Sequence, residues 1–210
     1  MRDRASSIWT LTLKDFRRQA SSHHPTPGGG SVAIVAAVLG CTLISMAVKI
    51  TARKGNADAK LEDASRKLRV LVDRLKHYAD ADIKLFKRYL AANRLSTKTG
   101  DEQTARGRLT QAAESATKIL LKAAEDMLSA MRLAEAIIPI TALNVVSDVG
   151  AGRAILDGAL RALLYDVDSN LKDLQPDIAA EFRKTRAAIQ MEADAVSIRT
   201  NRETEFFLNG

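Results

Sequence analysis

The chain has 210 residues, of which 46% are hydrophobic but only 4% are aromatic. This length suits one domain, or one compact unit of an oligomer, whose core is built from many small aliphatic contacts. The formal net charge is +7, but basic and acidic residues are mixed along the chain without interleaved aromatic residues, so we expect no nucleic-acid partner. A single cysteine excludes an intrachain disulfide, and the three histidines show no metal-ligand spacing, so we expect no metal.

The first 30 residues contain one predicted helix and a glycine-rich turn. The start of the chain has no apolar segment suited to a signal peptide, and we expect a cytoplasmic protein. Residues 8–20 have the pattern of a short amphipathic helix. The stretch PTPGGG at 25–30 cannot continue this helix, because prolines disfavour helix in the residues before them and glycines cost backbone entropy.

An uncharged segment runs from Ser31 to Val48. Ser31 stands where an N-cap is expected, since its side-chain oxygen can accept a hydrogen bond from a free N–H. The length is marginal for a membrane span, and the many Ala, Gly and Ser residues are only weakly hydrophobic, so we expect no membrane. We predict a small-residue helix that is buried on all sides. Full burial in a chain this small suggests a second subunit, and hence a homodimer.

The rest of the chain is helical in pattern. Helices are predicted over residues 57–94, over 103–136, after the short segment at 143–152 to about Leu171, and from Pro176 to about residue 201. Residues 96–103 (STKTGDEQ) are predicted to form a loop. The sequence therefore predicts an all-α protein, an elongated bundle of five to six helices that forms a single domain over 1–210.

Asp82 lies on a helical stripe that otherwise carries apolar residues. A carboxyl group there must be partnered, or its pKa rises, and a raised pKa suits an acid/base catalyst near neutral pH. The alternatives are a salt bridge at a helix interface and a surface position slightly out of phase with the stripe.

Several motifs in this order resemble one family. They are the PTPGGG turn, the step Leu43-Ile44-Ser45-Met46, the pair Asp82 and Phe86, LNVVSDVGAG at 143–152, and Leu160-Arg161 followed by Asn170. Together they resemble the cyclodeaminase/cyclohydrolase family, which includes the C-terminal half of formiminotransferase-cyclodeaminase and stand-alone methenyltetrahydrofolate cyclohydrolases. The resemblance covers roughly residues 15–175. Lys49 and Asp166 depart from it, because the family usually has Asn at both positions.

The resemblance implies an all-helical homodimer that binds a tetrahydrofolate derivative as its substrate. The expected reaction is hydrolysis of 5,10-methenyltetrahydrofolate to 10-formyltetrahydrofolate. One alternative is the cyclodeaminase reaction, which closes the formimino group onto the ring and releases ammonia. Another is a folate-binding or structural paralogue without catalysis.

Asp148 and Asp82 are the expected catalytic residues for that chemistry. Asp148 could activate the water that attacks the methenyl bridge and could stabilise the positive charge of the bridge. Its alternative role is to cap a helix that starts near Val149, and the two roles can coexist. We expect Asp148 and the glycine turn to converge on one cleft between helices.

The substrate-binding residues are expected around the glycine turn, where a ligand can come close to a helix start with free N–H groups. Alternatively the turn only lets the uncharged helix enter the core. Lys49, Arg53 and Lys54 either bind the glutamate carboxylates of folate or complement the helix dipole. Arg161 either contacts substrate or pairs with Asp157, four residues earlier. The full expected set is Thr26, Gly28, Gly29, Gly30, Ser31, Asn144, Ser147, Lys49, Arg53, Lys54, Arg161 and Asp166.

Overall fold

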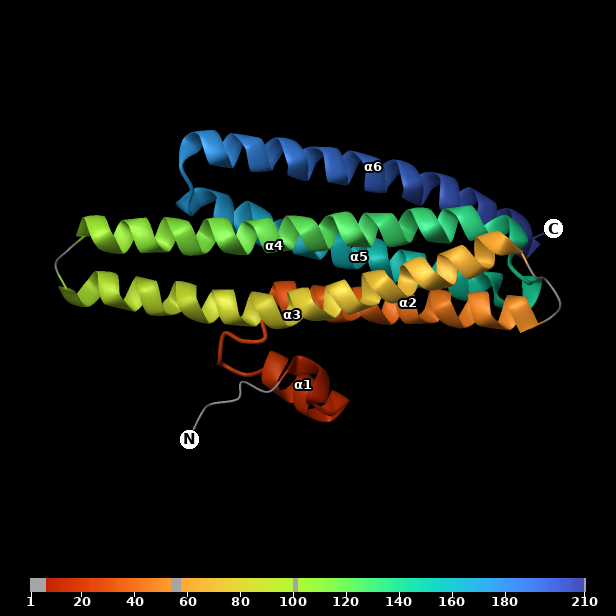
Figure 1. Cartoon of the computed structure of the whole chain (residues 1–210), viewed down its shortest axis with the longest axis horizontal. Coiled ribbons are helices and arrows are strands. Elements are labelled where there is room, and N and C mark those ends of the chain that lie inside the picture. Colours follow the sequence, from red (N-terminus) through yellow and green to blue (C-terminus); the bar gives the residue numbers. More distant parts are fainter. Residues whose placement is uncertain (1–6, 54–57, 100–101, 210) are drawn as a thin grey trace.

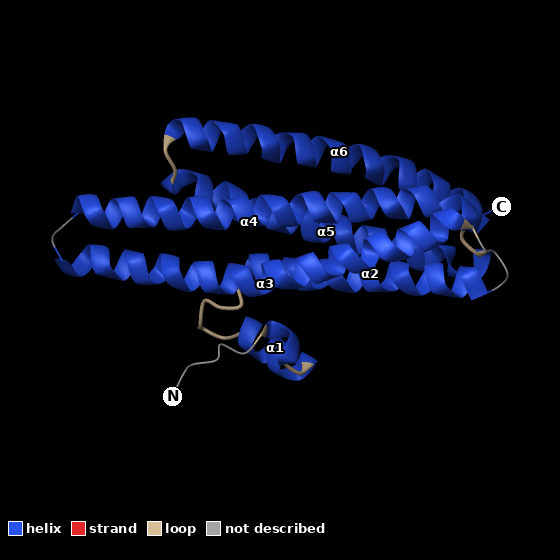
Figure 2. Ribbon diagram, viewed as in Figure 1, coloured by secondary structure: helices blue, strands red, loops and turns tan. Residues whose placement is uncertain are grey.

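The computed structural model describes residues 7–53, 58–99 and 102–209, and these residues contain helices and connections but no strand. Figures 1 and 2 show an elongated bundle in which the long helices run side by side. The predicted all-α bundle is confirmed. The α-helices are α1 (Leu13–Ala20), α2 (Gly29–Arg53), α3 (Ala59–Thr99), α4 (Glu102–Ile137), α5 (Val146–Asn170) and α6 (Pro176–Asn209).

Four helices form the core of the bundle. Helix α2 packs against α3 and α5, and α4 packs against the same two helices, so that the four close a ring around the buried aliphatic side chains. Helix α6 covers α4 and α5 from outside, and the short α1 lies to the side of the bundle (Figure 1). The segment before α1 is tied to α3 by the Trp9 indole N–H, which donates to the Lys76 carbonyl at 2.9 Å.

Two glycines let α2 and α5 cross closely. A Cβ atom added at Gly152 would lie 2.7 Å from the Gly40 carbonyl oxygen and 2.6 Å from Cγ1 of Ile44. Side chains essentially never approach this closely, so the crossing requires glycine there. The two helices run antiparallel, because Gly29 at the start of α2 lies beside Asp166 near the end of α5. The start of α2 and the end of α5 therefore meet at one end of the bundle.

In addition to the start of α5, which lies at Val146, the structure changes three predicted boundaries. Residues 8–20 are not one helix, because a 3₁₀ turn over Ile8–Thr10 precedes α1, which is capped by the Thr12 side chain. The predicted loop at 96–103 is wrong for most of its length, since α3 continues to Thr99 and α4 begins at Glu102, while residues 100–101 lie outside the described part. The last helix also extends beyond residue 201, to Asn209.

Helix α2 is buried on one side within a single chain. Cys41, Ile44 and Ala47 are fully buried, whereas Leu39 is 56% exposed and Met46 is 39% exposed. By length and composition α2 could cross a membrane, but just over half of its most apolar window is buried inside the bundle, as in the core helix of many folded proteins. The predicted burial on all sides would therefore need a second molecule.

Candidate functional site

The glycine turn leads directly into α2. The helix begins at Gly29, and its first backbone bond runs from the Val32 N–H to the Gly28 carbonyl at 3.1 Å. The prediction that Ser31 is the N-cap is therefore wrong, because Ser31 lies inside the first turn. Its hydroxyl donates to Oδ2 of Asp82 on α3 at 2.6 Å, and its backbone N–H donates to the same carboxyl. A carboxylate from a neighbouring helix thus does the capping that the sequence assigned to Ser31.

A second carboxyl group, from Asp166 on α5, reaches the same helix start. A Cβ atom added at Gly30 would lie 3.1 Å from both Asp82 oxygens and 3.2 Å from Oδ2 of Asp166. The nearest oxygens of the two carboxyl groups are therefore no more than 6.3 Å apart, the sum of those distances. Asp166 also lies 3.0 Å from the position of a Cβ at Gly29. The glycines leave the space that the two carboxyl groups use.

These residues enclose a cavity of about 200 Å³ between α2, α3, α4 and α5. The structure thus brings together Thr26, the three glycines, Ser31, Asp82 and Asp166 from the predicted site. The lining residues are Thr26, Gly28, Gly29, Gly30, Ser31, Asp82, Ile83, Phe86, Tyr89, Ala116, Leu120, Asp166, Ser169 and Asn170. Hereafter this space is called the α2 cavity.

Burial raises the pKa of both aspartates. For Asp82 the cause is loss of solvent, opposed by the hydrogen bonds from Ser31. For Asp166 burial comes first and the nearby Asp82 charge second, and together they raise the pKa from 3.8 to about 6. The expectation of a raised pKa at Asp82 agrees with this environment. A carboxyl pair of this kind can exchange protons near neutral pH and can attract a cation.

Two aromatic side chains on α3 form one wall of the α2 cavity. Phe86 and Tyr89 are stacked with ring centroids 6.2 Å apart, and the Tyr89 hydroxyl donates to Asp173 at 2.9 Å. Burial, and then this bond, raise the pKa of Tyr89. The predicted site did not include Tyr89, although its spacing from Asp82 and Phe86 places all three on one side of the helix. That spacing was the signal that could have found it.

Asp148 lies away from this cavity within one chain. It sits in the first turn of α5, where an acidic side chain suits the helix dipole, and α5 begins at Val146 rather than near Val149. Asp148 and Asp166 are 18 residues apart on the same helix, which corresponds to roughly 27 Å. The expected meeting of Asp148 with the glycine turn therefore does not occur inside a single chain. Its catalytic role remains a prediction that needs a second subunit.

The other predicted site residues of LNVVSDVGAG lie near Asp148, away from the α2 cavity. Asn144 and Ser147 are exposed at the end of the bundle where α5 begins. Arg161 is also outside the cavity lining, and its guanidinium donates to Asp157 at 3.1 Å and to Asp194 at 2.6 Å. The alternative of an ion pair four residues apart is confirmed for Arg161.

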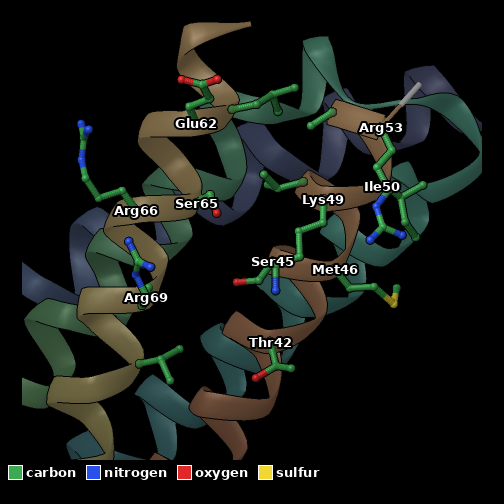
Figure 3. A pocket seen from close by; sticks show the side chains of 14 residues that line it. Thr42, Ser45, Met46, Lys49, Ile50, Arg53, Glu62, Ser65, Arg66 and Arg69 are labelled. Carbon is green, nitrogen blue, oxygen red and sulfur yellow. The ribbon is translucent and has the colours of Figure 1, made fainter. Parts of the chain in front are cut away.

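Lys49 and Arg53 line a separate surface groove of about 800 Å³ between α2 and α3. Arg66 and Arg69 border the same groove from α3 (Figure 3). Gly30 and Lys49 are 19 residues apart on α2, roughly 28 Å, so the groove lies at the opposite end of α2 from the cavity. Lys54 lies outside the described residues.

Metal-binding geometry is not found in the described part of the chain, where no group of three or more His, Cys, Asp or Glu side chains is placed to hold an ion. Among these residues, the candidate site therefore consists of the carboxyl pair Asp82 and Asp166, the glycine turn before α2, and the aromatic wall on α3.

Comparisons with known proteins agree with this architecture. A family model described as formiminotransferase-cyclodeaminase matches residues 12–189. The chain is 29% identical over 193 residues to a methenyltetrahydrofolate cyclohydrolase of Methylorubrum extorquens, covering 90% of this chain and 93% of that protein. It is also 29% identical over 188 residues to a formimidoyltransferase-cyclodeaminase of Rattus norvegicus, covering 87% of this chain but only 34% of the rat protein.

A solved structure shares the fold. The crystal structure of a formiminotetrahydrofolate cyclodeaminase from Thermotoga maritima matches with a TM-score of 0.80 at 20% identity, over 97% of this chain and 98% of that one. The helix order, the glycine turn and the matched region of 12–189 lead to one conclusion. The chain belongs to the formiminotransferase-cyclodeaminase family.

Proposed function

We propose that the protein hydrolyses 5,10-methenyltetrahydrofolate to 10-formyltetrahydrofolate in the cytoplasm, without a metal, and that the one-carbon bridge binds in the α2 cavity. The observation that carries this proposal is the pair of carboxyl groups, no more than 6.3 Å apart, at a helix start cleared by glycines. The similarity to the Methylorubrum cyclohydrolase over 90% of the chain supports the choice of reaction. The cavity volume of about 200 Å³ is below the size of a typical cofactor pocket, so the rest of the folate would lie outside it.

The chemistry follows from the charge of the substrate. The methenyl bridge is an amidinium cation, and the carboxyl pair stabilises it. Asp82, held in place by Ser31, accepts a proton from a water molecule as the water oxygen attacks the bridge carbon. The tetrahedral intermediate then breaks its bond to N5 as Asp82 returns its proton to N5, the hydroxyl of the intermediate loses its proton to solvent, and the formyl group stays on N10. The balance is one water consumed and one proton released.

The second candidate is the cyclodeaminase reaction, which the similarity to the rat protein favours. In that reaction a protonated carboxyl of the pair would donate its proton to the departing ammonia. Both reactions begin from a cationic carbon–nitrogen group and can use the same two aspartates. Purified protein supplied with each substrate in turn separates the two candidates.

We further propose that the working unit is a homodimer formed through the exposed side of α2 and α5. Leu39 and Met46 on α2 and Ile155 and Tyr165 on α5 are exposed apolar residues, and Tyr165 is 72% exposed. A second copy would bury them. Association of this kind would also bury the exposed side of α2, as the sequence-based prediction of a helix buried on all sides requires.

Charge favours an antiparallel pairing across a two-fold axis. Gly29 and Lys49 are each ten residues from Leu39, or about 15 Å along α2. An axis near Leu39 would place the partner's Lys49 beside the acidic α2 cavity. The same two-fold axis would pass near the middle of α5, because α5 runs antiparallel to α2. It would bring the partner subunit's Asp148 toward Asp166. Asp148 could then take part in catalysis, as the sequence predicts.

The direct test is the absorbance of methenyltetrahydrofolate after mixing with purified protein. We expect decay well above the rate in buffer. Folate binding without decay would instead support a non-catalytic paralogue. The variant Asp148→Asn tests whether the second subunit completes the site with Asp148. A dimer that keeps its full rate with this change would leave Asp148 with a structural role only, at the start of α5.

A further inference from the structure

We propose that Asp166 makes the α2 cavity selective for a cationic one-carbon bridge over the neutral formyl group that hydrolysis produces. This inference rests on the proposed function and assigns a specificity role to one residue of the site. It predicts that the charge of Asp166 strengthens the binding of substrate but not of product.

The position of Asp166 supports this role. Both of its carboxyl oxygens lie within 3.2 Å of the place that a Cβ at Gly29 would occupy, so the group lies directly against the start of α2. It is half-buried and lines the cavity. A ligand that entered the cavity beside Gly29 would therefore meet this carboxyl group.

Within the described residues, Asp166 lacks a charged partner of opposite sign. No hydrogen bond or ion pair among them reaches its carboxyl group, in contrast to Asp168, whose two oxygens accept from Arg186 at 3.1 Å. The charge that acts on Asp166 comes from another carboxylate, that of Asp82. An uncompensated pair of like charges is costly, and a bound cation would remove the cost.

None of the described residues that line the α2 cavity is a titratable cation. Among the described lining residues, the turn before α2 contributes Thr26 and Gly28, α2 itself contributes Gly29, Gly30 and Ser31, and α4 contributes Ala116 and Leu120. Helix α3 contributes Asp82 and Tyr89, and Tyr89 is bonded to Asp173 beyond α5. The charge that a ligand meets in this cavity is thus set by the two carboxyl groups, with the N–H groups of α2 as the only counterweight among these residues.

The consequence is a difference between substrate and product. The amidinium is attracted by the carboxyl pair, whereas the formyl group that replaces it carries no charge. One additional negative charge about 5 Å from a cation, at a partly solvated site, changes affinity on the order of tenfold. The same carboxylate leaves a neutral ligand almost unaffected, so hydrolysis itself weakens binding and favours product release.

The experiment compares two folates with the variant Asp166→Asn. The one-carbon bridge of methenyltetrahydrofolate is cationic, whereas the one-carbon group of 5-formyltetrahydrofolate is neutral, and both folates carry the same glutamate carboxylates; below, cation and neutral folate refer to this one-carbon group. We expect Asp166→Asn to raise the KM for the cation about tenfold and to change the Kd of the neutral folate, measured by calorimetric titration, by less than about twofold. In the unchanged protein the KM for the cation should fall as pH rises through about 6, and this step should vanish in the variant.

The control is Asp73→Asn, which removes one negative charge from an exposed position on α3 that is not among the residues lining the cavity. It should leave both affinities unchanged. Equal weakening of the two folates by Asp166→Asn, or no weakening of either, would overturn the proposal. If the protein shows no turnover, the cation is not consumed and its Kd is read by the same titration. Charge selectivity without turnover would then refute the proposed function while supporting this inference.

Discussion

Replacing Asp166 with Asn should stabilise the protein at alkaline pH and not at acidic pH. The folded state holds the Asp166 proton up to a pKa of about 6, whereas an ordinary aspartate loses it near 3.8. The folded state therefore binds more protons than the unfolded state between these values, and its stability falls as pH rises through this window. Above about pH 6 the Asp166 charge lowers the stability of the fold by its full amount, and below about pH 4 it does not lower the stability at all.

The size of this effect on the free energy of unfolding follows from the difference between the two pKa values. For a group shielded from solvent, that difference corresponds to about 3 kcal/mol. The Asp166 carboxyl is only half-buried, so screening reduces the value, and we expect about 1 kcal/mol. For a chain of this length, about 1 kcal/mol shifts the melting temperature by roughly 2–4 °C.

The assay is thermal unfolding followed by circular dichroism at about pH 8 and about pH 4. Asp166→Asn should melt higher than the unchanged protein at the first pH and at the same temperature at the second. Asp73→Asn serves again as the control for loss of one charge. A gain of equal size at both pH values, or no gain at about pH 8, would refute the inference that a half-buried, uncompensated charge lies at the start of α2.

Three further changes test other parts of the structure. Gly152→Ala should destabilise the fold by about 2 kcal/mol in chemical denaturation, because its Cβ would meet Ile44 at 2.6 Å while the gain in helix propensity is only about 1 kcal/mol; unchanged stability would contradict the close crossing. Gly30→Ala should lower folate turnover at least tenfold with helicity retained in circular dichroism, because its Cβ takes space between the two carboxyl groups; normal turnover would remove the cavity from the mechanism. Leu39→Glu should convert a dimer to monomers in sedimentation equilibrium, since it places a charge on the exposed side of α2; a dimer that persists would place the interface elsewhere.

Much of the fold could be predicted because the helical pattern is strong. The prolines and the glycine turn mark the breaks, and the apolar spacing in the long segments marks the faces. The boundary errors have local causes. STKTGDEQ contains residues typical of loops, but α3 continues to Thr99 and α4 begins at Glu102, and the two long helices pack against each other elsewhere along the bundle. Propensity alone could not show this, because it does not include the neighbouring helix.

The site was predicted in part. The raised pKa expected for Asp82 depended only on its place on an apolar stripe, and that inference agrees with the structure. Asp166 was included as a departure from the family pattern, but its closeness to Asp82 depends on the antiparallel crossing of α2 and α5, which no local pattern contains. The prediction that Asp148 lies near the glycine turn depended on the motif around Asp148. The length of α5 separates the two within one chain.

In the proposed reaction, the carboxyl pair beside Gly30 does the chemistry. The most direct test of this role is the decay of methenyltetrahydrofolate absorbance with Asp82→Asn, measured beside the unchanged protein and Asp73→Asn. We predict a loss of about a hundredfold or more in kcat with Asp82→Asn, because the proton acceptor is removed, and full activity with Asp73→Asn. An Asp82→Asn protein that folds and turns over substrate at the normal rate would contradict a catalytic role for this carboxyl pair.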